Sequence, residues 1–160
     1  MTACEWPGTI YLTKNTDAVG NDTPGDWNHA AIYVGNKIVV EAQRQPNAVI
    51  QVEQELFEAR YPEFVILEHV NSDTSMYAAG FALEYIGTTF RELASVFLHR
   101  RPGENCVSIC RKAYMEASGI DPRWRRPDHI YRDKNFRIMG HKKDYENWRP
   151  MDDQFKGRIL

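Results

Sequence analysis

Short apolar runs bounded by Gly, Pro, Asn and Asp dominate the first half of the chain, as they do in strands. In the second half, apolar positions recur at helical spacing up to about residue 117. The runs predict strands at 9–12, 28–34, 38–42, 49–52 and 64–69, a polar loop at 14–25 and a short helix or turn at 56–61. The helical spacing predicts a helix that is capped by Ser72 or Asp73 and ended by Gly87, and further helices at 90–98 and 105–117. Antiparallel strands followed by helices in one domain define the α+β class.

The strands at 28–34 and 38–42 are joined at Gly35-Asn36, which is a strong hairpin turn. The register of this hairpin can be described by the sum of the numbers of two paired residues. In the register with a sum of 72, Gln43 lies opposite His29, and Glu41 lies one diagonal step away on the same face. A sum of 71 puts Glu41 on the other face. The first register requires a loop with an odd number of residues, and a loop of residues 35–37 with a bulge meets that requirement.

The segment 105–117 predicts a buried helix with a cysteine in its first turn. Asn105 is a suitable N-cap, and Gly119 suits the position just beyond the C-terminus. Cys106 would then lie beside unpaired backbone N–H groups at the positive end of the helix dipole, which stabilise a thiolate, the nucleophilic form. The alternative is a small apolar residue that begins a helix, since free cysteines are among the most buried residue types. The apolar stripe of this helix consists of Val107, Ile109, Cys110, Ala113, Tyr114 and Ala117.

Length and composition fit one globular domain, and the cysteines favour a reducing compartment. The chain has 160 residues with ordinary apolar and charged fractions. Its three cysteines form no CxxC pair, and Cys106 and Cys110, one helical turn apart, are poorly placed for a disulfide bridge. The N-terminus shows neither the basic nor the apolar region of a signal peptide, and no apolar run reaches the length of a membrane span. We therefore expect a soluble protein made in the cytoplasm.

Charge is divided unevenly between the two halves of the chain. Residues 1–80 carry 4 Lys and Arg against 11 Asp and Glu, whereas residues 81–160 carry 16 against 11. Within the second half, 121–143 has 8 basic residues against 3 acidic ones, interleaved with Trp124, Tyr131 and Phe136. That mixture is typical of nucleic-acid binding, so a non-catalytic module that binds a polyanion is one hypothesis. A solvated basic loop beside a catalytic site is the preferred interpretation.

A nucleophilic cysteine needs a base, and the base needs a third group that fixes its tautomer. Among the five histidines, His29 alone opens an apolar strand that has a carboxylate on its partner strand. Glu41 and Gln43 are both candidates for the third group, which would accept the Nδ1–H of the imidazole, because an amide oxygen can also fix a tautomer. The alternatives are a structural histidine at 29 and a solvent-facing strand end at 41.

An ordered set of short motifs resembles a known family. The motifs are GTIYL at 8–12, NHAAIYVG at 28–35, VVEA at 39–42, GTTF at 87–90 and NCVS at 105–108. They occur in the order seen in circularly permuted NlpC-type papain-like proteins, a group that includes the YiiX-like bacterial hydrolases and has the lecithin:retinol acyltransferases as cousins. The phrase PDHIY at 127–131 also resembles the loop that follows the cysteine helix in YiiX-like members. The resemblance covers about residues 7–140, although the first motif has Gly-Thr where the family usually has Gly-Asp.

The resemblance implies a papain-like fold, in which an antiparallel sheet packs against helices and the nucleophile lies at a helix N-terminus. It matches Cys106 to the nucleophile, His29 to the base and Glu41 to the orienting residue, which places Glu41 ahead of Gln43. Residues 1–143 would form the catalytic domain, and 144–160 a C-terminal strap or extension of the same domain.

These assignments predict a cysteine-dependent hydrolase that cleaves an amide bond, of the peptidoglycan stem-peptide or isopeptide type, through a thioester. A thiol acyltransferase or lipid-acyl hydrolase of the lecithin:retinol acyltransferase type ranks second, because no exposed apolar anchor for a lipid is evident, and the polyanion-binding module ranks third. No cofactor and no metal are expected, since Cys106, Cys110, His129 and His141 lack the spacing of a zinc site. The expected partner is a peptide or acyl substrate, with the oligomeric state left open. Delivery to the cell wall would require a route without a signal peptide.

Overall fold

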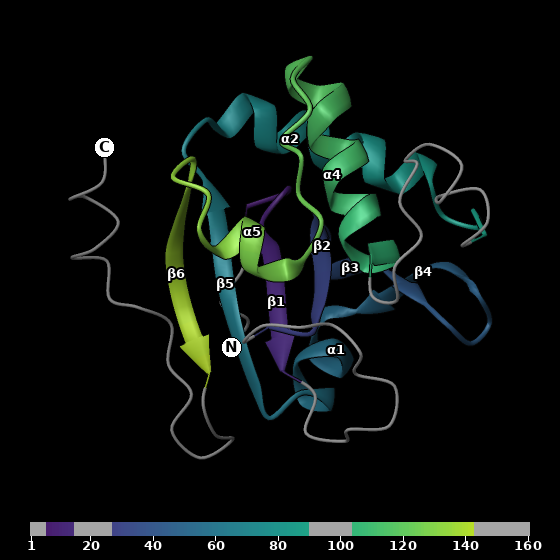
Figure 1. Cartoon of the computed structure of the whole chain (residues 1–160). Coiled ribbons are helices and arrows are strands. Elements are labelled where there is room, and N and C mark those ends of the chain that lie inside the picture. The colour runs from purple at the N-terminus through teal and green to yellow at the C-terminus, as the bar shows by residue number, and fades with distance from the viewer. Residues whose placement is uncertain (1–5, 15–26, 90–103, 143–160) are drawn as a thin grey trace.

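The computed structural model describes residues 6–14, 27–89 and 104–142 of the chain (Figure 1). These residues form one antiparallel sheet with the strand order β4-β3-β2-β1-β5-β6. The strands are β1 (Ile10–Lys14), β2 (His29–Gly35), β3 (Ile38–Gln43), β4 (Ala48–Glu53), β5 (Glu63–His69) and β6 (Phe136–Lys142). The helices are α1 (Gln54–Arg60), α2 (Ser72–Glu84), α4 (Glu104–Ser118) and α5 (Pro127–Tyr131). The α+β class is confirmed, and each predicted strand is present within one or two residues.

Both faces of the central strands are covered. Helices α2 and α4 lie side by side over one face (Figure 1), where Ile32 and Val40 of the sheet share a core with Ala78 and Ile109 of the helices. Because successive side chains of a strand point to opposite faces, the intervening residues form a second core around Phe57 of α1. None of the helices in the described ranges is long and apolar enough to cross a membrane.

The hairpin of β2 and β3 has the register that sums to 72. Ile32 pairs with Val40, and Tyr33 pairs with Val39. The odd-numbered residues of both strands therefore share a face, as the prediction for Glu41 required.

The turn of this hairpin differs from the predicted three-residue loop. Gly35 already pairs with Ile38, so the loop consists of Asn36 and Lys37, whose φ values of 52° and 60° suit a type I′ turn. The register shift lies inside β2, between Tyr33 and Gly35. A bulge in the strand thus supplies the odd residue that was expected in the loop.

Helix α2 begins at Ser72 with Asn71 as its N-cap, one or two residues before the predicted caps. The Asn71 side chain accepts a hydrogen bond from the backbone N–H of Thr74 at 3.0 Å. Asn is as good an N-cap as Ser or Asp, so composition alone does not distinguish neighbouring candidates.

The region after Gly119 contains regular structure that its sequence pattern does not predict. Strand β6 pairs with β5, with a register shift between Ile66 and Leu67. The strand has no clear alternation of apolar and polar residues, because it contains Gly140 and a buried Lys142. The predicted helix at 90–98, the tail at 144–160 and most of the loop at 14–25 lie outside the described residues.

Gly8 lies where the turn before β1 passes close to α2. Its φ is +93°, and a Cβ at this position would lie 2.1 Å from the carbonyl oxygen of Ser75. The hydroxyl of Tyr114 in α4 donates a hydrogen bond to the carbonyl of Gly8 at 2.5 Å. Ser75 in turn donates to the carbonyl of Pro7 at 2.7 Å. The turn is therefore fixed to both helices of the larger core.

Gly8→Ala is expected to lower the free energy of unfolding by about 2–4 kcal/mol, because the new Cβ overlaps backbone atoms and the φ is unfavourable for alanine. Urea unfolding measures the loss. Gly119→Ala is the matched control, since Gly119 also has a positive φ of +75° but a Cβ there would meet nothing within 4 Å. The control should lose only about 1 kcal/mol, and equal losses in the two variants would contradict the steric argument.

Candidate active site

Cys106 lies in the first turn of α4 and is 6% exposed. The helix begins at Glu104, so Asn105 is inside it and is not the N-cap that the sequence predicted. Gly119 follows the last helical residue, as predicted. The first turn of a helix has backbone N–H groups without intrahelical partners. The side chain of Cys106 forms a hydrogen bond with the side chain of His29.

His29 is the first residue of β2 and forms a hydrogen bond with Glu41 of β3. The distance from Nε2 of His29 to Oε2 of Glu41 is 2.8 Å, and Glu41 is 0% exposed. The sequence-based prediction used Nδ1 for this bond, and the structure corrects it to Nε2. The hydrogen bond to Cys106 therefore belongs to Nδ1, the remaining ring nitrogen. His29 thus lies between the other two predicted site residues.

The charge of Glu41 fixes the tautomer of His29. Burial raises the pKa of Glu41, but the hydrogen bonds and positive charges of His29 and Arg60 outweigh burial and lower that pKa below its ordinary value. An ionised carboxylate can only accept hydrogen bonds, so Nε2 of His29 carries the proton and donates it. In the neutral imidazole, Nδ1 is then an acceptor for the thiol proton of Cys106, as a general base requires.

The pKa of His29 is raised well above its ordinary value. Burial opposes the charged imidazolium, but the interaction with Tyr61 and the hydrogen bonds to Cys106 and Glu41 outweigh it. The surroundings of His29 therefore favour the protonated ring, which is the form that results when the histidine takes a proton from the thiol.

Arg60, the last residue of α1, belongs to the site although no local sequence pattern points to it. Its Nη1 donates a hydrogen bond to Oε1 of Glu41 at 2.6 Å, so each carboxylate oxygen has a donor. The Arg60 side chain is 40% exposed, whereas Glu41 is buried. Arg60 thus compensates the charge of a carboxylate that would otherwise be costly to bury beside a neutral histidine.

Two aromatic rings from the end of α1 support the imidazole. The Tyr61 ring stacks on His29 with 5.9 Å between centroids and 26° between planes, and the Phe57 ring lies at 6.5 Å. Phe57, Arg60 and Tyr61 have the spacing i, i+3 and i+4, which places them on one side of a helical turn. The aromatic pair at i and i+4, Phe57 and Tyr61, is the signal in the sequence that could have indicated this face of α1, whereas Arg60 itself has no distinguishing pattern.

The other candidates from the sequence are not part of this arrangement. Gln43 pairs with Ala48 of β4, and it is Glu41 that contacts the imidazole. Cys110 is fully buried, and burial together with the neighbouring Cys106 raises the pKa of its thiol far above the ordinary value. Cys110 is therefore a neutral core residue.

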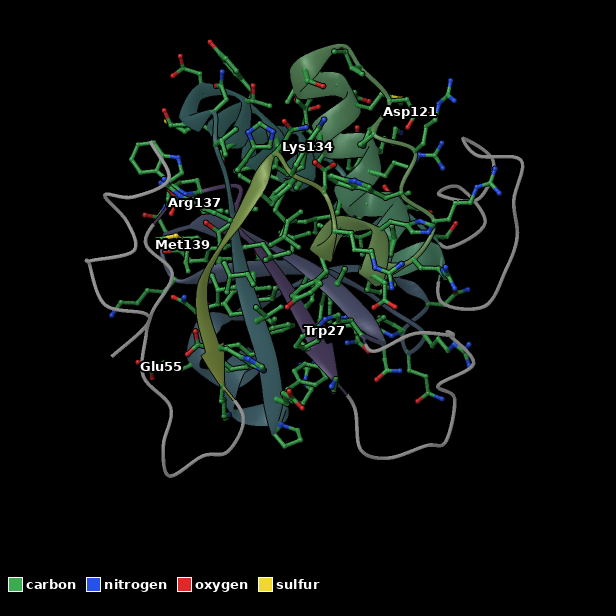
Figure 2. The ribbon with its side chains drawn as sticks, turned by 60° about the vertical axis from the view of Figure 1, so that its left-hand side comes forward. Trp27, Glu55, Asp121, Lys134, Arg137 and Met139 are labelled. Carbon is green, nitrogen blue, oxygen red and sulfur yellow. The ribbon has the colours of Figure 1, made fainter. Side chains whose placement is uncertain are left out.

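The aromatic side chains of the basic segment 121–143 differ in exposure: Phe136 is partly buried, whereas Tyr131 is 41% exposed. Trp124 is buried and donates its indole N–H to Asp133 at 2.9 Å. Asp128 of α5 accepts a hydrogen bond at 3.0 Å from the backbone N–H of Trp27, which Figure 2 shows at the lower end of the sheet. Trp27 lies two residues before His29, so this segment helps to fix the start of β2. The burial of Trp124 weakens the argument for a base-stacking platform.

The fold and the site define an α+β protein in which a helix-start cysteine, a histidine and a buried glutamate form a hydrogen-bonded series. No family model and no curated protein matches the chain. The fold is similar to the crystal structure of the metalloprotein yiiX from Escherichia coli O157:H7, with a TM-score of 0.62 and 13% sequence identity. The match covers 84% of this chain and 96% of the other. The fold of a YiiX-like protein is therefore shown, in agreement with the YiiX-like part of the sequence resemblance.

The description of yiiX as a metalloprotein raises the question of a metal at this site. His29 uses its two nitrogens for partners on different sides, Glu41 at Nε2 and Cys106 at Nδ1, so the three side chains do not converge on one point. Within residues 6–14, 27–89 and 104–142, no group of three or more His, Cys, Asp and Glu side chains could hold a metal ion. The described residues do not fit a metal centre.

Proposed function

We propose that this protein is a cysteine-dependent hydrolase that cleaves an amide bond through a thioester intermediate. Cys106 is the nucleophile, His29 the general base and acid, and Glu41 the group that orients His29. The observation that carries the proposal is the hydrogen bond from Nε2 of His29 to the buried carboxylate of Glu41, since it leaves Nδ1 to accept the proton of Cys106.

The reaction begins when Nδ1 of His29 removes the thiol proton of Cys106. The sulfur attacks the carbonyl carbon of the substrate, and the tetrahedral intermediate collapses as the C–N bond breaks. His29 gives its proton to the leaving amine, and a thioester on Cys106 remains. In the second half, His29 takes a proton from water and the hydroxide attacks the thioester. The C–S bond then breaks as His29 returns this proton to the sulfur, which releases a carboxylic acid and the free thiol.

The start of α4 supplies the second requirement of acyl transfer, stabilisation of the oxyanion. The backbone N–H of Cys106 lies in the first turn of α4, at the positive end of the helix dipole. A negative charge that develops on the carbonyl oxygen beside the sulfur would be stabilised by this donor and by the helix dipole.

Alkylation with iodoacetamide at pH 6–7 tests the nucleophile without knowledge of the substrate. We expect Cys106 to react at least about tenfold faster than an unperturbed cysteine at the same pH, because His29 accepts its proton, and we expect Cys110 to remain unmodified. Mass spectrometry of peptides locates the label. A label absent from Cys106 under conditions that modify a control thiol would contradict the proposal.

An activated ester tests the second half of the reaction and separates hydrolysis from transfer. With p-nitrophenyl acetate, the protein should release more than one equivalent of p-nitrophenolate and carry an acetyl group on Cys106 during turnover. Addition of a primary amine that captures the acetyl group faster than water does would favour the acyltransferase alternative. Release of only one equivalent of p-nitrophenolate, with the acetyl group retained permanently on Cys106, would contradict turnover.

A further inference from the structure

Lys142, the last residue of β6, is a buried lysine that contacts the end of α1. It is 4% exposed, and its Nζ donates hydrogen bonds at 2.8 Å to the carbonyl oxygens of both Glu58 and Tyr61. The ammonium group also lies over the ring of Phe64, 5.3 Å from its centroid. Lysine is almost never buried without partners, so a buried ammonium group with two carbonyl acceptors indicates a specific structural task.

That task is to complete the last turn of α1. The final carbonyl groups of a helix have no intrahelical donors. A positive charge at this end is favourable because it lies beside the negative end of the helix dipole. Helix α1 has only 7 residues, and its N-cap, Glu53, makes no side-chain capping hydrogen bond. A helix this short has little stability of its own, so its position depends on contacts made by its ends and its buried face.

The turn that Lys142 holds is the one that supports the proposed base. Arg60 donates to Glu41, and the Tyr61 ring stacks on His29, while the carbonyl of Tyr61 accepts from Lys142. A shift of this turn would therefore move both a donor of Glu41 and the ring that supports the imidazole.

We propose that Lys142 is a positioning residue for the catalytic site, acting through the last turn of α1 on Glu41 and His29. The inference rests on the proposed function only in that the reactivity of Cys106 is its readout. Lys142 touches neither the thiol nor the imidazole in the hydrogen bonds described above, and it comes 81 residues after Tyr61 in the chain.

The experiment compares Lys142→Met, Lys142→Arg and Arg137→Met by alkylation of Cys106 as a function of pH. Methionine approximates the apolar stem of the lysine side chain but lacks the charge and the donors, so the last turn of α1 loses its hydrogen bonds to β6. The alkylation rate at pH 6 should fall about tenfold, because small displacements of a catalytic group have large effects on rate. The pH midpoint of the profile should move upward by about one unit, because a displaced His29 and Glu41 stabilise the ion pair with the thiolate less well.

Two variants serve as controls. Lys142→Arg retains a cation with several donors and should restore most of the rate and the original midpoint. Arg137 lies on the same strand (Figure 2) but forms an ion pair with Glu68 of β5 at 2.8 Å. Its replacement by methionine should lower the melting temperature without moving the midpoint.

The outcomes separate this inference from the proposed function. An unchanged profile in Lys142→Met, with reactive Cys106, would overturn the positioning role and leave the hydrolase proposal intact. Unreactive Cys106 in the wild-type protein would overturn both.

If Lys142→Met does not fold, Lys142→Gln replaces it, since glutamine retains a donor. In Lys142→Gln, an upward shift of the midpoint supports the role and an unchanged midpoint overturns it. The effect should also be smaller in an Arg60→Met background, and full additivity would contradict action through α1.

Discussion

Cys106→Ser is expected to reduce turnover of acyl substrates by at least about a thousandfold and to leave the melting temperature nearly unchanged. Serine is close to isosteric with cysteine and is tolerated at the start of a helix. Its hydroxyl, however, holds its proton far more tightly than a thiol, so the base proposed at His29 would take that proton much less readily. The rate of p-nitrophenolate release and the thermal unfolding curve measure the two expectations.

The matched control is Cys110→Ser, one helical turn away on α4. Cys110 is fully buried in the core between the sheet and the helices. Its replacement should cost about 1–2 kcal/mol of stability, because a hydroxyl is buried in an apolar site, and turnover should be retained. Retained turnover in Cys106→Ser would reject Cys106 as nucleophile, and a loss only in Cys110→Ser would place the chemistry elsewhere.

Glu41→Gln is expected to lower the pKa of His29 and to reduce turnover by about 10- to 100-fold. The carboxylate of Glu41 stabilises the imidazolium of His29 through the 2.8 Å hydrogen bond, and a neutral amide does so much less. The amide can also present its NH₂ group to the imidazole, which would favour the wrong tautomer. NMR titration of the His29 ring protons measures the pKa directly.

Gln43→Ala is the control for this variant. Gln43 lies two residues further along β3, so loss of its side chain should cost little beyond packing and should leave the pKa of His29 in place. A His29 pKa that is unchanged in Glu41→Gln, or one that falls as far in Gln43→Ala, would contradict the assignment of Glu41.

The same pair makes stability depend on pH in a defined window. The folded-state pKa of His29 lies above its ordinary value of 6.5, so the stabilisation from protonated His29 is complete below about pH 6.5 and is lost as pH rises through the folded-state pKa. The folded-state pKa of Glu41 lies below 4.5, so the stabilisation from ionised Glu41 is present above about pH 4.5 and is lost as pH falls. The difference in melting temperature between wild type and Glu41→Gln should therefore be largest between about pH 4.5 and 6.5.

Local patterns in the sequence were sufficient for the hairpin and for the cysteine helix. Gly35-Asn36 fixes where the chain turns, but it leaves more than one register open, and the bulge between Tyr33 and Gly35 is what puts His29 and Glu41 on one face. The apolar stripe of 105–117 and Gly119 define the helix that begins beside Cys106. These features depend on residues close together in the chain, which is why sequence reasoning finds them.

The supporting residues depend on tertiary contacts and were not predicted. Arg60 reaches Glu41 only because α1 folds against the end of β3, and its exposed, charged side chain has no distinguishing pattern. Lys142 lies in a strand whose glycine and buried lysine conceal the alternation of β6. The choice of Nε2 over Nδ1 likewise follows from the direction in which the His29 ring points, which register alone does not determine.

The order of the site residues along the chain has a consequence for the protein during its synthesis. His29, Glu41 and Arg60 leave the ribosome before Cys106, and Lys142 follows last. Strands β6 and β5 pair although they are far apart in the sequence: Arg137 donates a hydrogen bond to Glu68, 69 residues earlier in the chain. Such distant pairings form late, because closing a long loop has an entropic cost. We therefore expect the thiol of a nascent chain to be a poor nucleophile until the last strand of the sheet has docked.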